Sequence, residues 1–300
     1  MMAMKFRAHE TFFIRKGWLS KGMRYVSQKP DVFIDKNENP MDVLGIGANM
    51  VKSLRYWLQA VGLTCEPSKG KKIQTLTPFG ECVYKHDRYI EELGTLYLLH
   101  YNLVKDEMMA PSWHFFFNKF TMQEFTKEDF VEQIQNDLRM SRMSVAIRSL
   151  TDDFLCIANT YVPKYKTDVH KASPENNINC PLGELGLMDI LSRERGANLY
   201  KKSIPLVRSF HPWMIMAVIS EQAHGRNEIG LNELLTGTNN IGKVFNLDSI
   251  TMLDILHTVE KLGEIKIIRT AGLDVVRILN ARSFQQCVES YYADIEGINS

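Results

Sequence analysis

The sequence has 300 residues, which is enough for two ordinary domains or one large one. Hydrophobic residues make up 45% and charged residues 24%, a composition typical of globular proteins that bury substantial cores. The formal net charge is +1, so any basic surface must be local. A neutral total does not exclude nucleic acid as a ligand, because binding requires a basic patch and not a global excess.

The cysteines and the apolar runs indicate a cytoplasmic protein without membrane contact. The five cysteines are scattered and form no Cys-x-x-Cys pair, which favours reduced thiols over a disulfide framework or a zinc knuckle. The opening MMAMKFRAHETFF has neither a long apolar run nor a small-residue cleavage site, so no secretory signal is expected. No segment approaches the roughly 18 uninterrupted apolar residues of a membrane span.

Taken in chain order, the first elements predict a helix-turn-helix arrangement. A polar loop at 36–40 is followed by a short helix from Pro40, a glycine-rich turn and a longer helix within 45–63. A polar loop, EPSKGKK, then leads to a short strand-like run, IQTL, and to a helix with Thr77 as N-cap and Pro78 at its first position. Helix, turn, helix, short strand, helix is the order of a winged-helix variant of the motif.

The stretch GIGANMVKSLRYWLQAVGL, residues 45–63, has two faces when drawn as a helix. Its apolar residues recur at helical spacing and are expected to be buried: Met50, Leu54, Trp57, Leu58 and Val61. A polar stripe shares the opposite face, with two lysines of the predicted wing downstream: Asn49, Lys52, Arg55, Tyr56, Gln59, Lys71 and Lys72. Arg and Lys reach phosphates or guanine, and Asn and Gln reach adenine edges. The stripe therefore predicts DNA contact, with a merely solvated helix face as the alternative.

Charged side chains are threaded through aromatic ones in the first 25 residues. His9 and Glu10 precede Phe12 and Phe13, and Arg15 and Lys16 precede Trp18. Such a segment suits a catalytic surface, with His9 and Glu10 as candidates, or a DNA-contacting surface formed by Arg15 and Lys16. The alternative is an arm whose aromatic rings pack while its charges stay solvated.

A second cluster of candidate catalytic residues lies in HDRYIEELGTLYLLH. Asp87 and Glu91 are four residues apart, so on a continuous helix both carboxylates would lie on one face. Paired carboxylates with a nearby histidine suit Mg²⁺ or Mn²⁺ bound for phosphodiester hydrolysis. The alternative is an acidic first turn that simply favours the helix dipole.

The middle and end of the chain predict further helices and a second hairpin. YIEELGTLYLLHYNLV is expected to be a buried helix, and Thr126 with Asp129 forms an N-terminal capping pattern. Residues 161–181 are polar and contain three prolines, so they are the expected linker. Beyond them, three helical segments precede IKIIRTAGLDVVRIL, which alternates around a Thr-Ala-Gly turn as a hairpin does. Residues 182–300 therefore predict a second winged-helix-like domain.

The second domain differs from the first in the polar stripe of its third helix. That stripe is nearly neutral and contains no arginine: Thr251, Asp254, Thr258 and Lys261. Because an aspartate there would be repelled by phosphates, packing or partner docking is the expected role of this domain, including docking on a second copy of the chain.

Several standard catalytic motifs are absent from the sequence. It contains no GxxxxGK[ST], no GxSxG and no HExxH, which excludes the corresponding nucleotide-binding, hydrolase and zinc-protease patterns. GIGANM has glycines but follows no clear strand, so no dinucleotide site is expected. Nor is there a compact nuclease motif of paired acids with a nearby lysine, so metal ligands for DNA cleavage would have to come from distant segments.

At HETFFIRKGWLSKG, GIGANMVKSLRYWL, LTPFGE and HDRYIEELGTLYLLHYNL, the sequence resembles a family catalogued as a domain of unknown function. That family is encoded beside DNA phosphorothioation and phage-defence genes, and includes the B component of single-stranded phosphorothioation (Ssp) systems. The resemblance covers most of the chain and is most specific in residues 9–120. It implies DNA binding and nicking during sulfur insertion, with a cysteine desulfurase, an ATPase and a sulfur-transfer subunit as partners. It supplies no catalytic residues.

The sequence thus predicts a mainly α protein with small β wings, made of two winged-helix-like units joined by a helical middle region. The DNA-binding region is expected at 1–160, the linker at 161–181 and the docking domain at 182–300. The predicted function is a DNA-binding component of a phosphorothioation and defence system that nicks DNA with Mg²⁺ or Mn²⁺. A non-catalytic DNA-binding adaptor or transcription regulator is the alternative.

Overall fold

The chain folds into two compact units, called here the N-terminal unit and the C-terminal unit. The computed structural model describes residues 4–163, 180–194, 197–270 and 273–297. The N-terminal unit comprises Met1–Phe116 and Phe120–Ser203, and the C-terminal unit comprises Phe117–Lys119 and Ile204–Ser300. The boundary therefore falls after Ser203, later than the predicted linker at 161–181 and the predicted domain start at 182.

A sheet of the N-terminal unit explains this later boundary. Strand β4 (Met188–Glu194) pairs antiparallel with β5 (Ala197–Lys202), and β5 pairs with β3 (Glu124–Phe125), giving the order β3-β5-β4. The 3₁₀-helix η4 (Pro181–Leu185) also belongs here, since it buries Leu182 and Leu185. The backbone groups of β5 are paired on both sides within the N-terminal unit, so these strands cannot belong to the following domain. Residues 164–179 of the predicted linker lie outside the described residues.

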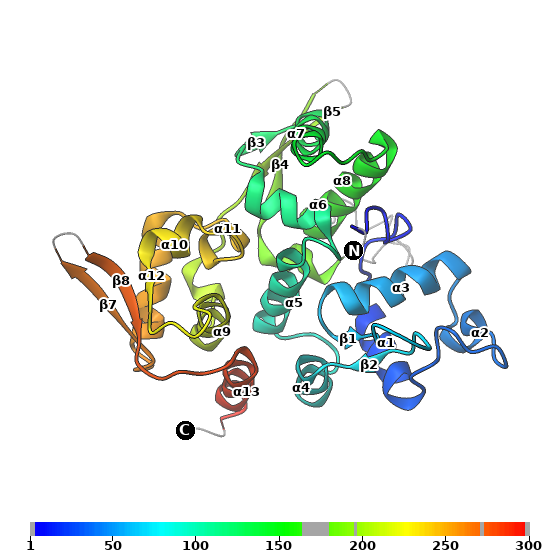
Figure 1. Ribbon diagram of the computed structural model, residues 1–300, viewed down its shortest axis with the longest axis horizontal. Helices are drawn as coiled ribbons and strands as arrows, with labels where there is room; N and C mark the ends of the chain where they lie inside the picture. The colour runs from blue at the N-terminus through cyan, green and yellow to red at the C-terminus, as the bar shows by residue number, and fades with distance from the viewer. Residues whose placement is uncertain (1–3, 164–179, 195–196, 271–272, 298–300) are drawn as a thin grey trace, which may run out of the picture. The chain divides into compact units, whose positions relative to one another are not determined.

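The first part of the N-terminal unit has the predicted order of helices around a short hairpin (Figure 1). Its elements are α1 (Trp18–Gln28), α2 (Pro40–Leu44), α3 (Ala48–Ala60), β1 (Thr64–Cys65), β2 (Thr75–Leu76) and α4 (Pro78–His86). Asn39 caps α2 by accepting from the backbone N–H of Met41, and Gly45 ends it in the left-handed conformation that glycine adopts without strain. Strands β1 and β2 pair antiparallel.

The predicted cap of α4 is confirmed. Thr77 accepts a hydrogen bond from the backbone N–H of Gly80, and Pro78 occupies the first helical position. The same hydroxyl donates to the carbonyl oxygen of Gly62 at 2.6 Å, which ties the start of α4 to the end of α3. Gly80 is required by this close approach, because a Cβ there would lie 2.0 Å from the carbonyl oxygen of Leu63.

Helix α5 (Leu93–Lys105) is the buried centre of the N-terminal unit. Its residues from Gly94 to Val104 are all buried, as expected for a helix that is apolar on nearly every side. The polar groups on it have partners: His100 Nδ1 lies 2.8 Å from the Tyr161 hydroxyl, and the Tyr97 hydroxyl donates to the carbonyl oxygen of Leu185. The helix begins at Leu93, later than the sequence predicted.

Aromatic side chains pack against one another in the rest of the N-terminal unit. They come from α6 (Pro111–His114), the π-helix η1 (Phe115–Lys119), β3, α7 (Lys127–Met140) and α8 (Ile147–Tyr161). The ring centroid of Phe116 lies 5.5 Å from that of Phe125 and 6.0 Å from that of Phe130. The predicted cap of α7 is confirmed as a full capping box between Thr126 and Asp129.

The C-terminal unit consists of helices around a second antiparallel sheet. Its elements are η5 (Val207–Ser209), α9 (Pro212–Gln222), β6 (Glu228–Gly230), α10 (Leu231–Thr236), α11 (Ile241–Val244), α12 (Ser249–Glu260), β7 (Ile265–Thr270), β8 (Leu273–Ile278) and α13 (Phe284–Ile295). The strand order is β6-β8-β7, and the predicted hairpin is confirmed, with Arg269 opposite Asp274. Figure 1 shows this hairpin extending from the helices of its unit.

The whole is mainly helical with small antiparallel sheets, which is the predicted fold class. Among the described residues, no helix has the length and apolar character that crossing a membrane requires.

Candidate functional site

The exposed start of α3 carries two of the predicted DNA-binding residues. Asn49 and Lys52 are both exposed, and Lys52 Nζ lies 3.5 Å from Asn49 Oδ1. Lys52 forms no ion pair within the described part of the chain, so its ammonium group is open to an external anion. These two residues keep the position that the sequence predicted for them.

Arg55 and Gln59 have a structural role that the sequence did not predict. Arg55 Nε donates to Glu66 Oε1 at 2.7 Å, and its Nη2 donates to the carbonyl oxygen of Lys72 at 3.0 Å. Gln59 Nε2 and Gln74 Nε2 donate to the same Glu66 oxygen, at 3.0 and 3.4 Å. This network, called here the Glu66 network, joins α3 to both ends of the loop between β1 and β2. Arg55 and Gln59 therefore hold the hairpin and do not form an open DNA face.

Tyr56 is a correction to the predicted stripe. Its side chain is only 6% exposed, and its hydroxyl donates to the carbonyl oxygen of Met109 at 3.1 Å. Burial raises the pKa of Tyr56 well above its ordinary value. Helical spacing placed Tyr56 beside Lys52, but residues near Met109 cover this part of α3, so Tyr56 belongs to the core.

The lysines of the β1–β2 loop are partly neutralised. Lys71 pairs with Asp31 at 2.8 Å, and Lys72 Nζ donates to the carbonyl oxygens of Pro67 and Ser68. Lys71 is nevertheless well exposed, so its ion pair is weak and screened by salt. The loop therefore presents a moderately basic tip.

His9 is buried, which corrects its assignment as a surface catalytic residue. It is 0% exposed, and its Nε2 lies 2.8 Å from Asp153 Oδ1. Asp153 also accepts from the hydroxyl of Ser112 and from the backbone N–H of Arg7, and the His9 ring stacks on Trp57. His9 thus anchors the N-terminal segment to α8 and cannot reach a substrate. Its neighbour Glu10 is half-buried and lies in the left-handed region at φ 51°.

Asp87 and Glu91 do not share a helix face, because the chain leaves the helix between them. Helix α4 ends at His86. The Asp87 carboxylate accepts hydrogen bonds from the backbone N–H groups of Glu91 at 2.8 Å and of Glu92 at 3.1 Å. Both oxygens of Asp87 are therefore engaged in capping the segment that begins α5. Asp87 is unsuited to be a metal ligand, whereas the exposed carboxylate of Glu91 is available.

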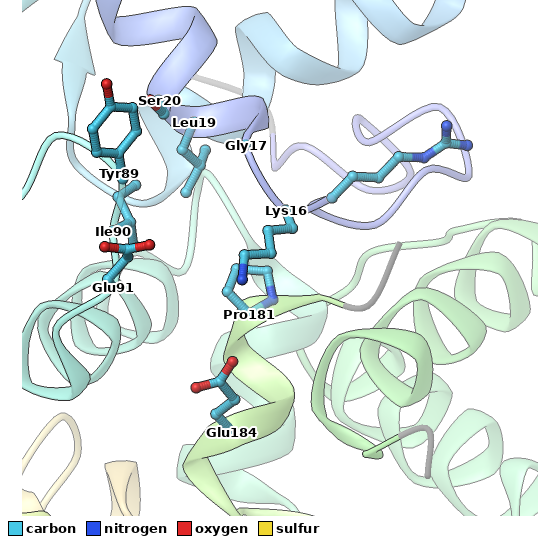
Figure 2. A pocket seen from close by; sticks show the side chains of 10 residues that line it. Lys16, Gly17, Leu19, Ser20, Tyr89, Ile90, Glu91, Pro181 and Glu184 are labelled. Carbon is cyan, nitrogen blue, oxygen red and sulfur yellow. The ribbon is translucent and has the colours of Figure 1, made fainter. Parts of the chain in front are cut away.

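A pocket at the start of α1 brings Glu91 together with Arg15 and Lys16. Its volume is about 170 Å³, and it is also lined by Ser20, Tyr89 and Glu184. Figure 2 shows Lys16, Glu91 and Glu184 arranged around this space, each from a different segment of the N-terminal unit. The pocket thus combines two candidate DNA contacts with one of the candidate catalytic acids, although they are far apart in the sequence.

The charged groups of this pocket differ in how the described residues engage them. The side chains of Lys16, Glu91 and Glu184 make no hydrogen bond or ion pair with the described residues. Helix α1 has no side-chain cap at Gly17, so the N–H groups of its first turn also lack a side-chain acceptor. Arg15 is held differently, with its guanidinium stacked 5.5 Å from the Phe12 ring centroid and 5.2 Å from that of Trp18.

The sequence did not predict that Glu184 and Tyr89 line this pocket. Glu184 follows the polar segment that was predicted to be a linker, and nothing in PLGEL marks it as part of a site. Tyr89 was placed inside a predicted helix, but it lies in the turn between α4 and α5 and is 67% exposed. An exposed aromatic residue beside charged ones was the only local signal available.

The carboxylates that line the pocket are too few to surround a divalent cation without oxygen ligands from water or a substrate. No group of three or more His, Cys, Asp or Glu side chains suited to a metal ion occurs among the described residues. Two carboxylates, from Glu91 and Glu184, do line the pocket. Mg²⁺ is commonly bound by one or two carboxylates, with water and substrate phosphate oxygens completing its shell. Glu91 and Glu184 fit that pattern, and Asp87 does not.

The family model described as a protein of unknown function (DUF4007) matches residues 6–292. The chain belongs to this family. Its fold is similar to two solved structures of SspB. Magnesium-bound SspB has a TM-score of 0.83 at 24% identity, covering 99% of this chain and 89% of that one. A second SspB structure has a TM-score of 0.81 at 25% identity, covering 98% and 89%. No curated protein matches the chain.

The SspB likeness extends over nearly the whole chain, so both units of this DUF4007 protein have counterparts in SspB. It supports the family resemblance predicted from the motifs at 9–120 and identifies the architecture as the SspB fold.

Proposed function

We propose that this DUF4007 protein is the DNA-binding component of a bacterial DNA phosphorothioation and phage-defence system, and that it nicks DNA in support of sulfur insertion. The proposal combines the SspB fold with what the family resemblance implies for its genes and partners. Those partners are a cysteine desulfurase, an ATPase and a sulfur-transfer subunit, all acting with it in the cytoplasm.

The observation that carries DNA binding is the open cationic start of α3. Lys52 and Asn49 are exposed there, and the basic tip of the β1–β2 loop, with Lys71 and Lys72, follows directly after the helix. Lysines bind phosphates at any sequence, and asparagine recognises an adenine edge. Arg55 and Gln59 stabilise this surface, because the Glu66 network holds the loop against α3.

Nicking is hydrolysis of one phosphodiester. The oxygen of a water molecule bonds to phosphorus, and the bond from phosphorus to one sugar oxygen breaks. One proton of the water goes to that sugar oxygen and the other to the terminal phosphate or solvent. A bound Mg²⁺ or Mn²⁺ supplies charge stabilisation at the phosphate oxygens, and Glu91 and Glu184 are the residues that would hold it. Glu10, half-buried in the N-terminal segment, remains a candidate proton acceptor.

One observation favours a non-catalytic DNA-binding adaptor or transcription regulator as the second candidate function. The part of the chain that the structure describes contains no group of three or more potential metal ligands. An adaptor needs only the α3 surface, so it would bind DNA as strongly as a nickase does.

The C-terminal unit is proposed to dock a partner, including a second copy of this chain. The exposed face of α12 carries Ile250, which is 72% exposed, together with Asp254 and His257. A large exposed apolar side chain beside an acidic one suits a protein partner better than a phosphate backbone.

The deciding experiment measures conversion of supercoiled plasmid to open circle by the purified full-length chain, with Mn²⁺, with Mg²⁺ and with a chelator. A nickase produces open circles only with the cation. Binding of duplex DNA without any nicking would select the adaptor, and failure to bind DNA at low salt would refute both functions.

A further inference from the structure

The connection between α7 and α8 is a basic and apolar surface that the proposed function does not use. It joins two neighbouring helices of the N-terminal unit and is called here the α7–α8 turn, residues 139–148 (Figure 1). Two large apolar side chains are exposed on it, Met140 at 85% and Ile147 at 59%. Three arginines are exposed on it as well: Arg139, Arg142 and Arg148. Methionine and arginine are both enriched where proteins bind one another, so this composition fits a protein partner.

The positive charge of the α7–α8 turn is not balanced within the protein. No acidic residue occurs from 138 to 149. None of the three arginines forms an ion pair with the described residues, and their one side-chain hydrogen bond there is a long one, 3.4 Å from Arg139 to Asn136. Backbone hydrogen bonds from Arg142 to Arg139 and from Met143 to Leu138 hold the turn in shape. It therefore offers three guanidinium groups to the carboxylates of another molecule.

The exposed apolar residues of the α7–α8 turn favour a protein over DNA or a membrane. A DNA backbone offers phosphates to the arginines but no apolar surface to Met140 and Ile147. Membranes are bound by helices that insert a whole apolar face. The apolar faces of α7 and α8 are instead buried in the core, through residues such as Leu138 and Leu150.

The end of α13 has the opposite charge and is called here the α13 end, residues 289–297. Three acids and one apolar residue are exposed on it: Glu289, Asp294, Ile295 and Glu296. No Lys, Arg or His occurs from 284 to 297, and Asp294 lies 3.2 Å from the ring of His211, outside that segment. Carboxylates at the C-terminal end of a helix oppose its dipole, so a cationic partner is favoured there.

We propose that the α7–α8 turn of one copy of the chain docks on the α13 end of a second copy, which rests on the proposed docking role of the C-terminal unit. Arginines then face carboxylates, and Met140 and Ile147 pack against Ile295. Opposite charges across such an interface select the partner and speed association. Each surface is small beside the roughly 20–30 residues that a stable interface takes from each partner. A two-fold dimer forms the contact twice, so a dimer is the expected assembly.

Charge reversal tests this docking in the full-length chain without DNA. The turn variant is Arg139→Glu with Arg142→Glu, and the end variant is Glu289→Lys with Glu296→Lys. Sedimentation velocity over a range of protein concentrations measures the dimer dissociation constant. Each variant alone should weaken self-association by at least about a hundredfold, because like charges then face each other. A wild-type chain that stays monomeric up to its solubility limit would overturn the proposal.

The matched control reverses two lysines elsewhere. Lys36→Glu with Lys85→Glu changes the net charge as much as the turn variant does, at exposed residues outside both surfaces. This control should associate as the wild type does. If it weakens association as strongly as the turn variant, net charge and not the α7–α8 turn governs the dimer, and the docking is wrong.

Mixing the turn variant with the end variant shows whether the contact joins two copies. In the mixture, the glutamates of one variant face the lysines of the other, and the remaining contact is native. Dimers should therefore return with nearly wild-type affinity, which also shows that both variants are folded. A mixture that stays monomeric contradicts docking between copies.

Further outcomes separate this docking from its rivals and from the proposed function. If the turn variant loses duplex binding but keeps the wild-type dimer, the arginines contact DNA and the docking is overturned. If Ile250→Asp on α12 abolishes the dimer and the end variant does not, the C-terminal unit docks through another surface. A monomeric wild type that nicks DNA keeps the function without the docking, and a charge-dependent dimer that does not bind DNA keeps the docking without the function.

Discussion

Two neighbouring residues of α3, Lys52 and Arg55, should respond to alanine substitution in opposite ways. Lys52 is exposed, and among the described residues its only hydrogen bond is the long one to Asn49, at 3.5 Å. Lys52→Ala should therefore change the free energy of unfolding by less than about 0.5 kcal/mol. Its effect should appear in DNA binding. Removing one phosphate contact lowers the salt slope, the change in log K with log salt, by about 0.9.

The size of that effect follows from the slope. Between about 50 and about 200 mM salt, a fourfold change, the loss of affinity should be about 3.5-fold smaller in Lys52→Ala than in the wild type. The effect should be nearly the same for any duplex sequence, because a phosphate contact carries no base information. Fluorescence anisotropy with two unrelated duplexes measures both quantities.

Arg55→Ala should act mainly on stability. It removes a 2.7 Å hydrogen bond to the Glu66 carboxylate and a 3.0 Å bond to the Lys72 carbonyl, in a region where Arg55 is 27% and Glu66 16% exposed. Hydrogen bonds to charged groups contribute roughly 1.5–3 kcal/mol, and partial exposure reduces this, so about 2 kcal/mol is expected. That corresponds to a Tm lower by roughly 5 °C for a unit of this size.

The result that would refute this reasoning is specific. If Lys52→Ala is folded and keeps both its affinity and its salt slope, the start of α3 does not contact DNA. If Arg55→Ala melts at the wild-type temperature, the Glu66 network does not hold the hairpin, and Arg55 returns to being a candidate DNA contact.

Three further substitutions test how the structure is held together. Asp87→Ala should lower the free energy of unfolding by about 1–2 kcal/mol in chemical denaturation, because the N–H groups before α5 lose their cap; an unchanged midpoint would contradict this. Gly80→Ala should cost more than about 3 kcal/mol in the same measurement, because the new Cβ would lie 2.0 Å from the Leu63 carbonyl oxygen. Burial lowers the pKa of His211 below its ordinary 6.5, although Asp294 opposes this, so the unfolded chain takes up the proton first. Stability should fall as pH drops from about 7.5 to about 5.5, and His211→Asn, which keeps a capping side chain, should show a smaller fall in Tm over that range.

The predictions made from short-range sequence patterns were the most reliable. The caps at Thr77 and at Thr126 formed as predicted, because each joins groups only three residues apart and needs no partner from elsewhere in the chain. The hairpin within 265–278 formed for the same reason, since its turn and alternating pattern specify the pairing locally. Lys52 and Asn49 are exposed at the start of α3, as predicted.

The sequence-based predictions were wrong where contacts from elsewhere in the chain outweighed a local sequence pattern. Asp87 and Glu91 have helical spacing, but the Asp87 carboxylate accepts hydrogen bonds from the backbone N–H groups of Glu91 and Glu92. Ile90 between them has a left-handed conformation at φ 56°, so no continuous helix joins Asp87 to Glu91. Helical periodicity places Tyr56 on the polar stripe, but in the structure the chain near Met109 covers it, so Tyr56 is part of the core. Neither the capping by Asp87 nor the burial of Tyr56 can be predicted from the residues within one helical turn.

The sequence by itself determined the mainly helical class, the caps, the hairpins and the basic residues at the start of the third helix, all of which depend on interactions within a few residues. Only the tertiary structure decided which charged residues meet. Lys16, Glu91 and Glu184 are separated by most of the N-terminal unit, and they line one pocket because the packing of α1, α5 and η4 brings their three segments together. Such a meeting depends on how the whole core is packed, and no periodicity or spacing in the sequence records it.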